Sequence, residues 1–437
     1  MTLDLFFEDF RVATLREGSA GIELAYDPAW LARPNAFPIS LSMPLVAEAY
    51  GAEKILPWLA NLLPESHLSE IGQLIGVSPQ DVIGLIRRMG RDTAGAISIG
   101  APRGDCNESR IVGGEAQLER IIEELPHRPF LVGDEGVSMS LAGAQEKLGV
   151  VLVDGEIAIP LNGSASTHIL KPDIRRLPGS VQNEAFCLTL ARLVGLDAAR
   201  VTTGVAGARS YLLVERFDRQ MTPHGVGRIH QEDLAQTLGV FPKDKYEFGS
   251  MGEKIGPGLR QLFNAVAERI SPGARLSLLD DLIFNVAVGN SDAHAKNYAI
   301  LIGAGGTTKL APIYDVLSGL VWPRVTKLLP QAINSQRDPA NLQGADWQAL
   351  AKEIGLSPAR TVKRVEAICG LVKKHADEAL GIVASMPAGG HPIMEQACHE
   401  AKKRGRRLLR QLAGSSITKG DNLTEDDGGV TMDAESN

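Results

Sequence analysis

The sequence contains few cysteines and few aromatic residues, and it has no excess of positive charge. Its four cysteines, Cys106, Cys187, Cys369 and Cys398, lie far apart, which fits neither a zinc-ligand spacing nor a dense disulfide framework. We therefore expect reduced, buried thiols. The formal net charge of −7 argues against a chain that holds nucleic acid by itself, because phosphate neutralisation needs a broad basic surface.

Long apolar runs are also missing. No stretch approaches the roughly 20 apolar residues that a membrane span needs, and the start MTLDLFFEDF lacks the pattern of a signal peptide. We therefore expect a cytoplasmic location and no membrane partner. With 44% hydrophobic and only 5% aromatic residues, a chain of 437 residues can bury a large core, and it should divide into two or three domains.

Hydrophobic periodicity predicts an α+β protein. The first hundred residues show strand-like runs ("LDLFF", "GIELAYD", "GAISIGA") around one helical stretch, "ILPWLANLLPESHLSEIGQLI". Residues 148–217 predict further strands, interrupted by a helix over 183–196 that Asn183 is suited to cap and Gly195 to end. From about Gln231 onward the pattern is mostly helical.

The C-terminal part changes charge abruptly. The stretch "KKRGRRLLRQL" from Lys402 places six basic residues on a predicted last helix, and residues 415–437 hold six acids against one lysine. The acidic tail lacks apolar periodicity and is expected to be disordered. For the basic stretch two interpretations remain open, a solvated helix face and a contact to phosphate or to a partner.

The segment "GNSDAHAKNYAIL" (289–301) carries the first indication of chemistry. Four residues separate Asp292 from Asn297. This is the spacing of the protein-kinase catalytic loop, in which the Asp accepts the proton of the substrate hydroxyl and the Asn binds magnesium. The alternative is an Asx-type turn that closes a buried helix.

Two further segments supply the rest of a phosphoryl-transfer site. Asp315 ends an apolar run in "KLAPIYDVLSG", at the place of the second magnesium-binding carboxylate of kinases. Lys171 ends the strand-like run "STHILKPD", where a lysine of the small lobe binds phosphate. Taken alone, the two residues also fit a strand-end turn and a solvated surface lysine. Gly143 lies between small residues in a turn before a strand, which alone indicates only a loop.

Together these segments resemble the HipA family of toxin serine/threonine kinases over nearly the whole chain before the tail. The matching segments are "SLAGAQEKL" (140–148), "HILKP" (168–172), "NEAFCLTLARLVGL" (183–196), "VERFDR" (214–219), "HQEDLAQ" (230–236), "NSDAHAKN" (290–297) and "PIYDVLS" (312–318), preceded by "SLSMPL" (40–45), "LPWLANLLPE" (56–65) and "GRDTAGAI" (90–97). One segment departs from the family pattern, "KLLPQAINSQRD" (327–338), which Pro330 interrupts.

The resemblance implies a protein-kinase-like two-lobe fold. The expected parts are an N-terminal α+β module (1–105), a strand-rich small lobe with the ATP-binding loop (106–225), a mostly helical catalytic lobe (226–414) and the acidic tail (415–437).

The resemblance also implies roles for individual residues, with ATP and Mg²⁺ as cofactors. Asp292 is expected to be the catalytic base, with Asn297 and Asp315 as the magnesium ligands and Lys171 as a contact to the ATP phosphates. The remaining residues expected at the nucleotide are Ser140, Leu141, Ala142, Gly143, Ala144, Gln145, Glu146, Lys147, Glu215, Phe217, Asp218, Gln231 and His294. Phe217 also fits a core aromatic, and His294 and Lys296, which flank the base, also fit a structural role.

In the family, the serine at the position of Ser140 is an autophosphorylation site. A phosphate adds about −1.5 to −2 charges, which would not remain packed beside the phosphates of ATP. Ser138 is an alternative acceptor, and a hydroxyl that only holds the loop is a third interpretation.

The resemblance further implies partners. These are a HipB-like helix-turn-helix antitoxin, DNA mainly through that antitoxin, and a protein substrate such as an aminoacyl-tRNA synthetase. Two rival functions remain at this stage, a kinase of a small molecule or lipid, and an inactive scaffold in a repressor complex. The presence of Lys171, Asp292, Asn297 and Asp315 together argues against the scaffold.

Overall fold

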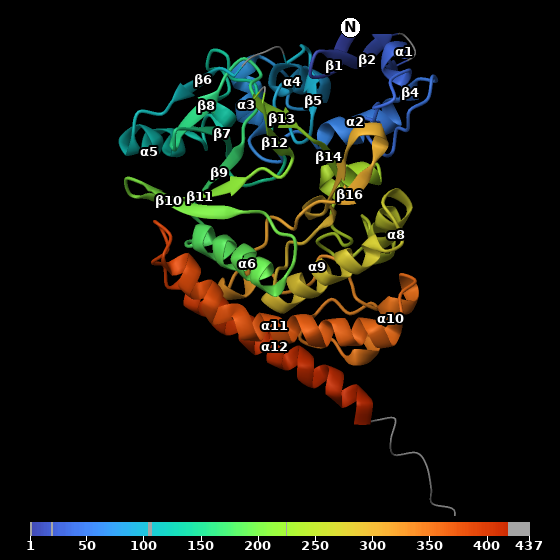
Figure 1. Cartoon of the computed structure of the whole chain (residues 1–437), viewed down its shortest axis with the longest axis vertical. Helices are drawn as coiled ribbons and strands as arrows, with labels where there is room; N and C mark the ends of the chain where they lie inside the picture. The colour runs from blue at the N-terminus through green and yellow to red at the C-terminus, as the bar shows by residue number, and fades with distance from the viewer. Residues whose placement is uncertain (1, 19–20, 104–106, 224, 418–437) are drawn as a thin grey trace, which may run out of the picture.

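The computed structural model describes residues 2–18, 21–103, 107–223 and 225–417. Figure 1 shows the N-terminal strands and small helices at one end of the molecule and the long helices α11 and α12 at the other. The combination of separate sheets and helices confirms the predicted α+β class. Cys106 and residues 418–437, which hold nearly all of the predicted acidic tail, lie outside the described residues.

The N-terminal module is a five-stranded antiparallel sheet with small helices. The strand order is β4-β3-β2-β1-β5. Its strands are β1 (Thr2–Phe7), β2 (Phe10–Gly18), β3 (Gly21–Tyr26), β4 (Tyr50–Gly51) and β5 (Ile97–Ile99), and its helices are α1 (Pro28–Leu31), α2 (Ala52–Ala60), α3 (Leu68–Ile75) and α4 (Val82–Met89).

The prediction of one continuous helical stretch in this module is wrong. The stretch is interrupted between α2 and α3 by residues 61–67, where Pro64 lacks a backbone N–H to donate and His67 adopts a left-handed conformation with φ of +61°. The break places residues 61–67 beside the loop of residues 140–147, where the amide of Glu65 donates to the carbonyl of Gly143 at 3.0 Å.

The small lobe is a six-stranded sheet in the order β10-β11-β9-β7-β8-β6. Its elements are β6 (Ser109–Ile111), α5 (Glu115–Glu124), η1 (Pro129–Leu131), β7 (Leu148–Val153), β8 (Glu156–Pro160), β9 (His168–Pro172), α6 (Ser180–Val194), β10 (Val201–Ala206) and β11 (Arg209–Glu215). Strand β9 lies inside this sheet between β7 and β11, and Lys171, near its end, pairs with Leu212 of β11.

Helix α6 begins earlier than the sequence predicts. It begins at Ser180 after Gly179, so Asn183 is not its cap. Asn183 lies inside the helix, where its side chain donates to the carbonyl of Ser318 at 3.0 Å and accepts from the Ser318 amide at 2.8 Å. The predicted end is confirmed, because Gly195 closes the helix with φ of +94°.

The catalytic lobe is mostly helical. A hairpin, β12 (Arg219–Thr222) with β13 (Gly225–Arg228), leads into it, and the three-stranded sheet β14-β15-β16 lies beside residues 289–297, the expected catalytic loop. The other elements are β14 (His230–Asp233), α7 (Leu234–Thr237), η2 (Pro242–Asp244), α8 (Leu259–Arg269), α9 (Ala274–Val288), η3 (Ala295–Asn297), β15 (Ala299–Ile302), η4 (Ala304–Gly306), β16 (Thr308–Leu310), η5 (Gly319–Val321), α10 (Gly344–Glu353), α11 (Pro358–Ala384) and α12 (Ile393–Ile417).

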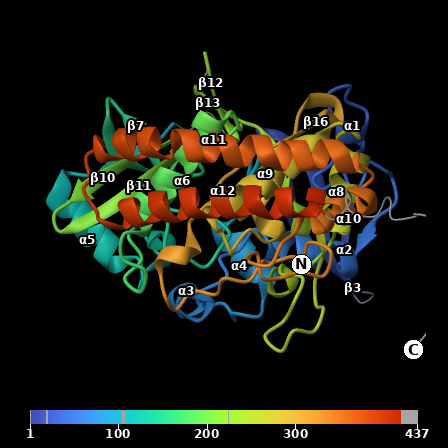
Figure 2. The same ribbon diagram turned by 90° about the horizontal axis from the view of Figure 1, so that it is seen from below.

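The two longest helices form the base of this lobe. Figure 2 shows α11 and α12 running side by side along the molecule. Helix α11 packs against α6, α9 and α10 as well as α12, so it supports both the small lobe and the catalytic loop. Among the described residues, no helix combines the length and the apolar character that a membrane crossing requires.

The hydrophobic core is shared by all three parts. One cluster of buried side chains includes Trp58 of the N-terminal module, Phe186 of α6 and Phe284 of α9. Burial of this kind contributes roughly 25 cal/mol per Å² of apolar surface. Cys187, Cys369 and Cys398 are free and buried, as predicted.

Candidate active site

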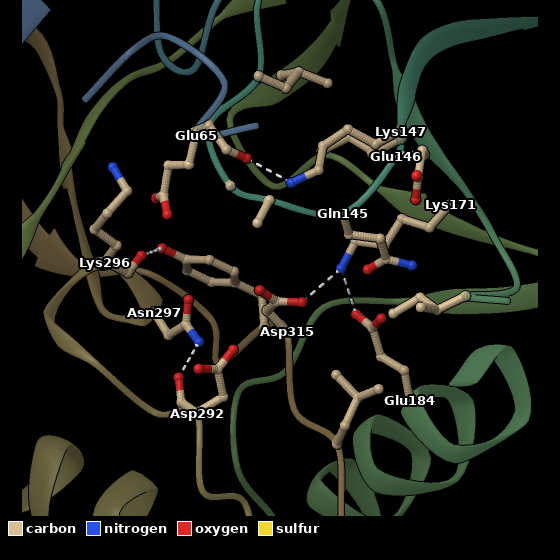
Figure 3. Close-up of a pocket in the computed structure, with 18 of the residues that line it drawn as sticks. Glu65, Gln145, Glu146, Lys147, Lys171, Glu184, Asp292, Lys296, Asn297 and Asp315 are labelled. Atoms are coloured by element: carbon tan, nitrogen blue, oxygen red, sulfur yellow. Dashed lines mark hydrogen bonds and ion pairs between the residues drawn. The ribbon is translucent and has the colours of Figure 1, made fainter. Parts of the chain in front are cut away.

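A cavity of about 1000 Å³ opens where the N-terminal module, the small lobe and the catalytic lobe meet. Each part contributes polar side chains to its walls. Figure 3 shows Glu65 and Lys147 on one side of this cavity and Asp292 and Glu184 on the opposite side. The segments predicted to carry chemistry are therefore brought together in one place.

Lys171 occupies the centre of a buried ion-pair cluster. Its Nζ lies 2.7 Å from Oε1 of Glu184 on α6 and 2.8 Å from Oδ1 of Asp315 (Figure 3). Burial alone lowers the pKa of Lys171, but the two carboxylates outweigh burial and raise it. For Asp315, burial is outweighed by the charges of Lys171 and Lys147, which hold its pKa well below the usual range. This lysine is therefore charged and is held in place by two carboxylates.

The backbone at Asp315 is strained. Its φ of +57° lies in the left-handed region, which costs a non-glycine residue roughly 1 kcal/mol. The side chain keeps 33% of its surface exposed although Lys171 contacts it. Strain of this kind persists where the surrounding structure fixes a functional group, and here it places a carboxylate in the pocket.

Local hydrogen bonds shape the catalytic loop. Gly289 ends α9 with φ of +76°, and the side chain of Asn290 then accepts from the Asp292 amide at 3.0 Å. Asn297 donates its Nδ2 to the carbonyl of Asp292 at 2.7 Å. These turn contacts are the alternative that the sequence left open, and they coexist with a carboxylate directed to the pocket.

Asp292 is the carboxylate of this loop that is open to a substrate, with 61% of its side chain exposed. The surrounding protein still removes part of its hydration and raises its pKa. Tyr246 donates a hydrogen bond to Oδ1 of Asp292 and opposes that rise, whereas the negative charge of Asp315 adds to it. The side chain is thus a base of raised pKa beside a phenol.

The two residues that flank this base are buried. Nζ of Lys296 lies 2.6 Å from Oδ1 of Asn61 and 2.9 Å from Oδ2 of Asp233, so it ties the loop to the N-terminal module. The imidazole of His294 lies 4.0 Å from the Asp292 carboxylate and packs edge-on against Tyr246. Burial holds the pKa of His294 well below its usual value, so the ring is neutral at pH 7.

The loop of residues 140–147 lies against residues 62–66 of the N-terminal module. Ser140 Oγ donates to the carbonyl of Leu62 at 2.7 Å, and the amide of Glu65 donates to the carbonyl of Gly143 at 3.0 Å. Ser66 Oγ donates to the carbonyl of Ala144 at 2.9 Å. Gly143 has φ of +106°, a conformation that side chains rarely adopt. We call residues 140–147 the glycine loop below.

The other side chains of the glycine loop point in different directions. Gln145 donates to the carbonyl of Pro172 at 3.2 Å, which joins the loop to β9, and Glu146 lies 3.8 Å from His67. Lys147 donates to the carbonyl of Ala142 at 2.5 Å. Burial lowers the pKa of Lys147 to about 8, and the charge of Lys171 acts in the same direction. Leu141 is buried in the core.

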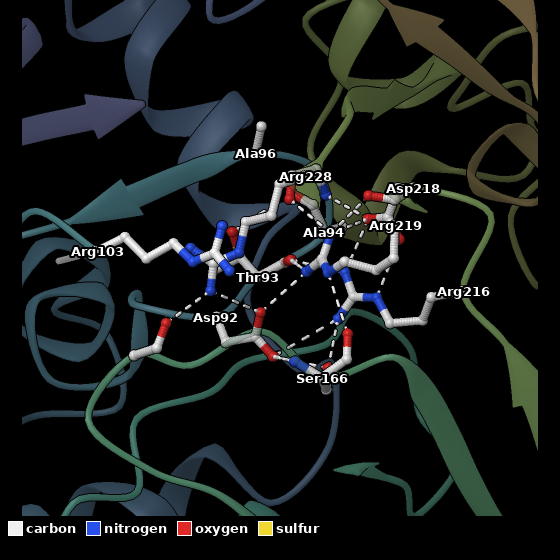
Figure 4. A network of polar contacts seen from close by, with 12 residues as sticks. Asp92, Thr93, Ala94, Ala96, Arg103, Ser166, Arg216, Asp218, Arg219 and Arg228 are labelled. Atoms are coloured by element: carbon white, nitrogen blue, oxygen red, sulfur yellow. Dashed lines mark hydrogen bonds and ion pairs between the residues drawn. The ribbon is translucent and has the colours of Figure 1, made fainter. Parts of the chain in front are cut away.

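The residues expected around the adenine lie in two environments. Glu215 is exposed, and Phe217 is partly buried with its ring 5.4 Å from that of Tyr314; both line the pocket. Gln231 donates to Oδ2 of Asp218 at 3.0 Å. Asp218 borders the pocket, but its carboxylate is buried in a polar network (Figure 4).

This buried network connects the segment "GRDTAGAI" to "VERFDR". Asp92 accepts from Arg219 at 2.9 Å and from Arg228 at 3.2 Å, while Arg216 binds Asp218 at 2.8 Å and the carbonyl of Thr93 at 2.8 Å. The positive charges of Arg216 and Arg219 outweigh burial and lower the pKa of Asp218. Both sequence motifs therefore belong to a buried joint between the N-terminal module and the edge of the pocket.

Several polar residues of the pocket were not predicted as site residues, among them Glu65, Glu184, Lys245 and Tyr246. Glu184 could have been predicted from the sequence. In protein kinases the phosphate-binding lysine pairs with a glutamate on the helix that follows its strand. Glu65, Lys245 and Tyr246 had no such signal. Glu65 pairs with Lys245 across 180 positions of sequence, and Tyr246 bonds to Asp292 across 46 positions.

The pocket offers oxygen donors suited to Mg²⁺. Because Nδ2 of Asn297 bonds to the Asp292 carbonyl, its Oδ1 is directed to the other side, into the pocket (Figure 3). Asp315 adds a partly exposed carboxylate. Within the described residues, no group of three or more His, Cys, Asp or Glu residues forms a metal cage. Magnesium is commonly held by one or two protein ligands plus substrate phosphates, so these residues fit it.

A strand-rich lobe with a buried Lys–Glu pair, facing a helical lobe with an Asp-x-x-x-x-Asn loop, defines a kinase-like protein. Comparison with known proteins refines this class. The HipA N-terminal domain matches residues 3–100, and the HipA-like C-terminal domain matches residues 139–378. The chain belongs to the HipA-like kinase family, as its sequence motifs predicted.

Individual relatives agree with this membership. The chain is 41% identical to "Putative kinase Y4mE" of Sinorhizobium fredii, covering 80% of this chain and 84% of the relative. It is 31% identical to "Serine/threonine-protein kinase toxin HipA" of Shewanella oneidensis, covering 82% and 84%.

A solved structure of the S. oneidensis toxin–antitoxin system, with HipA, HipB and operator DNA, has a chain that superimposes with a TM-score of 0.82 at 26% identity. The match covers 94% of this chain and 98% of that chain. The predicted kinase-like fold is thereby confirmed.

Proposed function

We propose that this chain is an ATP-dependent serine/threonine-protein kinase that acts as the toxin of a toxin–antitoxin pair. The observation that carries the proposal is the convergence of Lys171, Asp292, Asn297 and Asp315 on one pocket, with Lys171 already paired to Glu184. The name of the S. oneidensis relative, a serine/threonine-protein kinase toxin, supports the same activity.

In the proposed reaction, Asp292 accepts the proton of a serine or threonine hydroxyl as the oxygen attacks the γ-phosphorus of ATP, while the bond from that phosphorus to the bridging oxygen breaks and ADP leaves. Its exposed carboxylate and raised pKa suit a base that is free to meet a substrate. Lys171 presents its charge to the phosphates, and Glu184 keeps it in position. Asn297 and Asp315 hold Mg²⁺, which neutralises phosphate charge when it is bound.

The glycine loop covers the phosphates in this proposal, and Glu215, Phe217 and Gln231 lie at the adenine. We further propose autophosphorylation at Ser140 as an inactivating step. In the structure this serine is fully buried and its hydroxyl bonds to the Leu62 carbonyl. Phosphate transfer to Ser140 therefore requires the loop to leave residues 62–66 first.

The proposed partners follow from family membership. The solved complex of HipA with HipB and operator DNA supports a HipB-like antitoxin that contacts DNA. For this chain we propose the same kind of partner, a cytoplasmic location, and a protein substrate from the translation machinery such as an aminoacyl-tRNA synthetase.

The proposal is tested by incubating the full-length protein with ATP labelled at the γ-phosphate and with either cell lysate proteins or a protein-free metabolite and lipid extract. We expect magnesium-dependent label on protein serine or threonine, and no label with Asp292→Ala. Label only in the extract indicates a small-molecule or lipid kinase. No ATP turnover in any arm indicates an inactive scaffold.

A further inference from the structure

Glu65 of the N-terminal module contacts both catalytic elements of the pocket. Its backbone N–H donates to the carbonyl of Gly143 in the glycine loop at 3.0 Å. Its carboxylate forms an ion pair with Lys245, which precedes Tyr246 in the catalytic lobe. Figure 3 shows this carboxylate pointing into the cavity from the side of Lys147. One residue therefore joins the module to the glycine loop and to the opposite lobe.

Lys245 in turn supports the catalytic loop. Its carbonyl accepts the amide of Ala295 at 3.2 Å, and the adjacent Tyr246 donates to the Asp292 carboxylate. The ring of Tyr246 packs edge-on against His294. A shift of Lys245 would therefore displace Asp292 by two routes. One is the hydrogen bond from Ala295 to the Lys245 carbonyl, and the other is the hydrogen bond from Tyr246 to the Asp292 carboxylate.

A contribution to folding stability is not a sufficient explanation for the Glu65–Lys245 ion pair. The side chains keep only 14% and 12% of their surface exposed, and Oε1 of Glu65 is buried with no hydrogen-bond partner among the described residues. The free energy of removing both charges from water can cancel their mutual attraction, so a buried ion pair need not stabilise the fold. Its location in the pocket points to a role in the reaction.

We propose that Glu65 is a positioning residue of phosphoryl transfer, which sets the glycine loop and the catalytic loop at a fixed distance from each other through Gly143 and Lys245. This inference rests on the proposed kinase function. Positioning matters because a displacement of about 1 Å in a reactive geometry can cost about 100-fold in rate. The N-terminal module is then a component of the active site.

The kinetic test compares Glu65→Gln and Lys245→Met with wild-type full-length protein. We expect kcat to fall about 10- to 100-fold in each, with the Kd for ATP changed less than about threefold, because the nucleotide contacts themselves remain. Lys245→Arg keeps the charge and should stay within about threefold of wild type. The double variant should be no slower than the slower single variant, because both remove the same link.

A matched control separates this role from a general loss of stability. Glu8→Gln breaks another partly buried pair of the N-terminal module, with Arg103 at 2.9 Å, that does not line the pocket. We expect its kcat to equal that of wild type. Unchanged kcat in Glu65→Gln, or an equal fall in Glu8→Gln, would overturn the proposal.

A second measurement does not depend on turnover. In Lys245→Met, amide hydrogen exchange in residues 62–67 and 140–147 should become several-fold faster, although the substitution lies in the other lobe. Exchange identical to wild type in both segments contradicts the coupling. If wild-type protein transfers no phosphate, the proposed function fails, and the exchange result still decides whether Glu65 links the two loops.

Discussion

The Nζ atom of Lys171 lies 2.7 Å from Oε1 of Glu184, so an ion pair joins β9 to α6 at the centre of the pocket. Both side chains are almost completely buried. Burial raises the pKa of Glu184 and the charge of Lys171 opposes that rise. Removing one partner of a buried pair typically costs about 3–5 kcal/mol, because the other charge is left uncompensated. The pair therefore holds the small lobe in the arrangement that kinases need for transfer.

The first prediction concerns this pair. Glu184→Gln removes one carboxylate from Lys171 and leaves only Asp315 to hold it, so phosphoryl transfer should fall by about 100-fold, or about 2.7 kcal/mol of transition-state stabilisation. Steady-state kinetics with labelled ATP measures the loss. Glu353→Gln breaks an exposed pair with Arg260 and should leave the rate unchanged. A Glu184→Gln enzyme as fast as wild type contradicts the role given to the pair.

The second prediction separates the two aspartates. Asp292→Ala and Asp315→Ala should each reduce transfer by at least about 100-fold, the usual contribution of a general base. Only Asp315→Ala should also weaken binding of magnesium–ATP, because of the two aspartates only Asp315 is a proposed magnesium ligand and a contact of Lys171. Calorimetric titration of both variants measures the affinities. Retained transfer and equal affinities in the Asp292 variant would refute the assignment.

The third prediction is that Ser140 is the main autophosphorylation site and that its phosphate lowers activity. Because Ser140 is buried against Leu62, the reaction should be slow and should expose residues 62–66. Mass spectrometry after incubation with ATP locates the phosphate, and Ser140→Ala is the control. Phosphate only on Ser138, whose hydroxyl bonds to the Arg88 carbonyl, would show that the wrong serine was chosen.

The convergence of the candidate site residues was predictable from sequence where local spacing encodes it. Asp292 and Asn297 belong to one loop, and the Asn297 side chain bonds back to the Asp292 carbonyl, so their relation is fixed within a few residues. Lys171 and Asp315 each end an apolar run, and the structure brings them to 2.8 Å. The α+β class followed from the same periodicity.

Residues that depend on tertiary contact were not predictable in this way. Glu65 lies in a break between two helices that the sequence pattern shows as one, and its ion-pair partner is Lys245. Asp218 was expected near the adenine. In the structure its carboxylate instead accepts a hydrogen bond from Arg216, a contact that forms only when the chain folds. The start of α6 was also misplaced, because Asn183 resembles a cap but binds Ser318 from inside the helix.

The fourth prediction concerns the stability of the joint between the module and the catalytic lobe. Glu232 is buried; its Oε1 accepts the amide of Leu41 at 2.9 Å and the hydroxyl of Thr237 at 3.0 Å, while its Oε2 has no partner among the described residues. Burial raises the pKa of Glu232 from 4.5 to about 7. The folded state then binds more protons than the unfolded state between these pH values, so stability is lost as pH rises from 4.5 to 7.

Glu232→Gln removes this titration. Glutamine resembles the protonated acid, so the variant should match wild type near pH 4.5 and be more stable at pH 8, by up to about 3 kcal/mol. Thermal unfolding at both pH values measures the difference. The exposed Glu268→Gln serves as the control and should follow wild type at each pH. If the stability of Glu232→Gln depends on pH in the same way as that of wild type, then ionisation of Glu232 does not lower the free energy of unfolding, and the prediction is wrong.

The fifth prediction locates the end of the folded part. Helix α12 buries Leu408 and Leu412. The basic stretch is not solely a solvated helix face, because Arg404 is buried and donates to the carbonyl of Val286 on α9 at 2.9 Å. That carbonyl belongs to the helix that carries the catalytic loop, and it accepts from Gly289 as well. The basic stretch is therefore partly a structural contact.

Truncation after Gly414 should leave the melting temperature and the kinase rate unchanged, because the residues removed have few apolar side chains, without periodic spacing, with which to offset the entropy of ordering. Truncation before Lys402 removes Arg404 and both buried leucines, each of which contributes about 1.5–3 kcal/mol by burial. It should lower the melting temperature by several degrees and slow transfer, because the end of α9 loses its support. Thermal unfolding and kinase assays on both proteins test this, and a stable, active protein that ends before Lys402 would place the domain boundary ahead of α12.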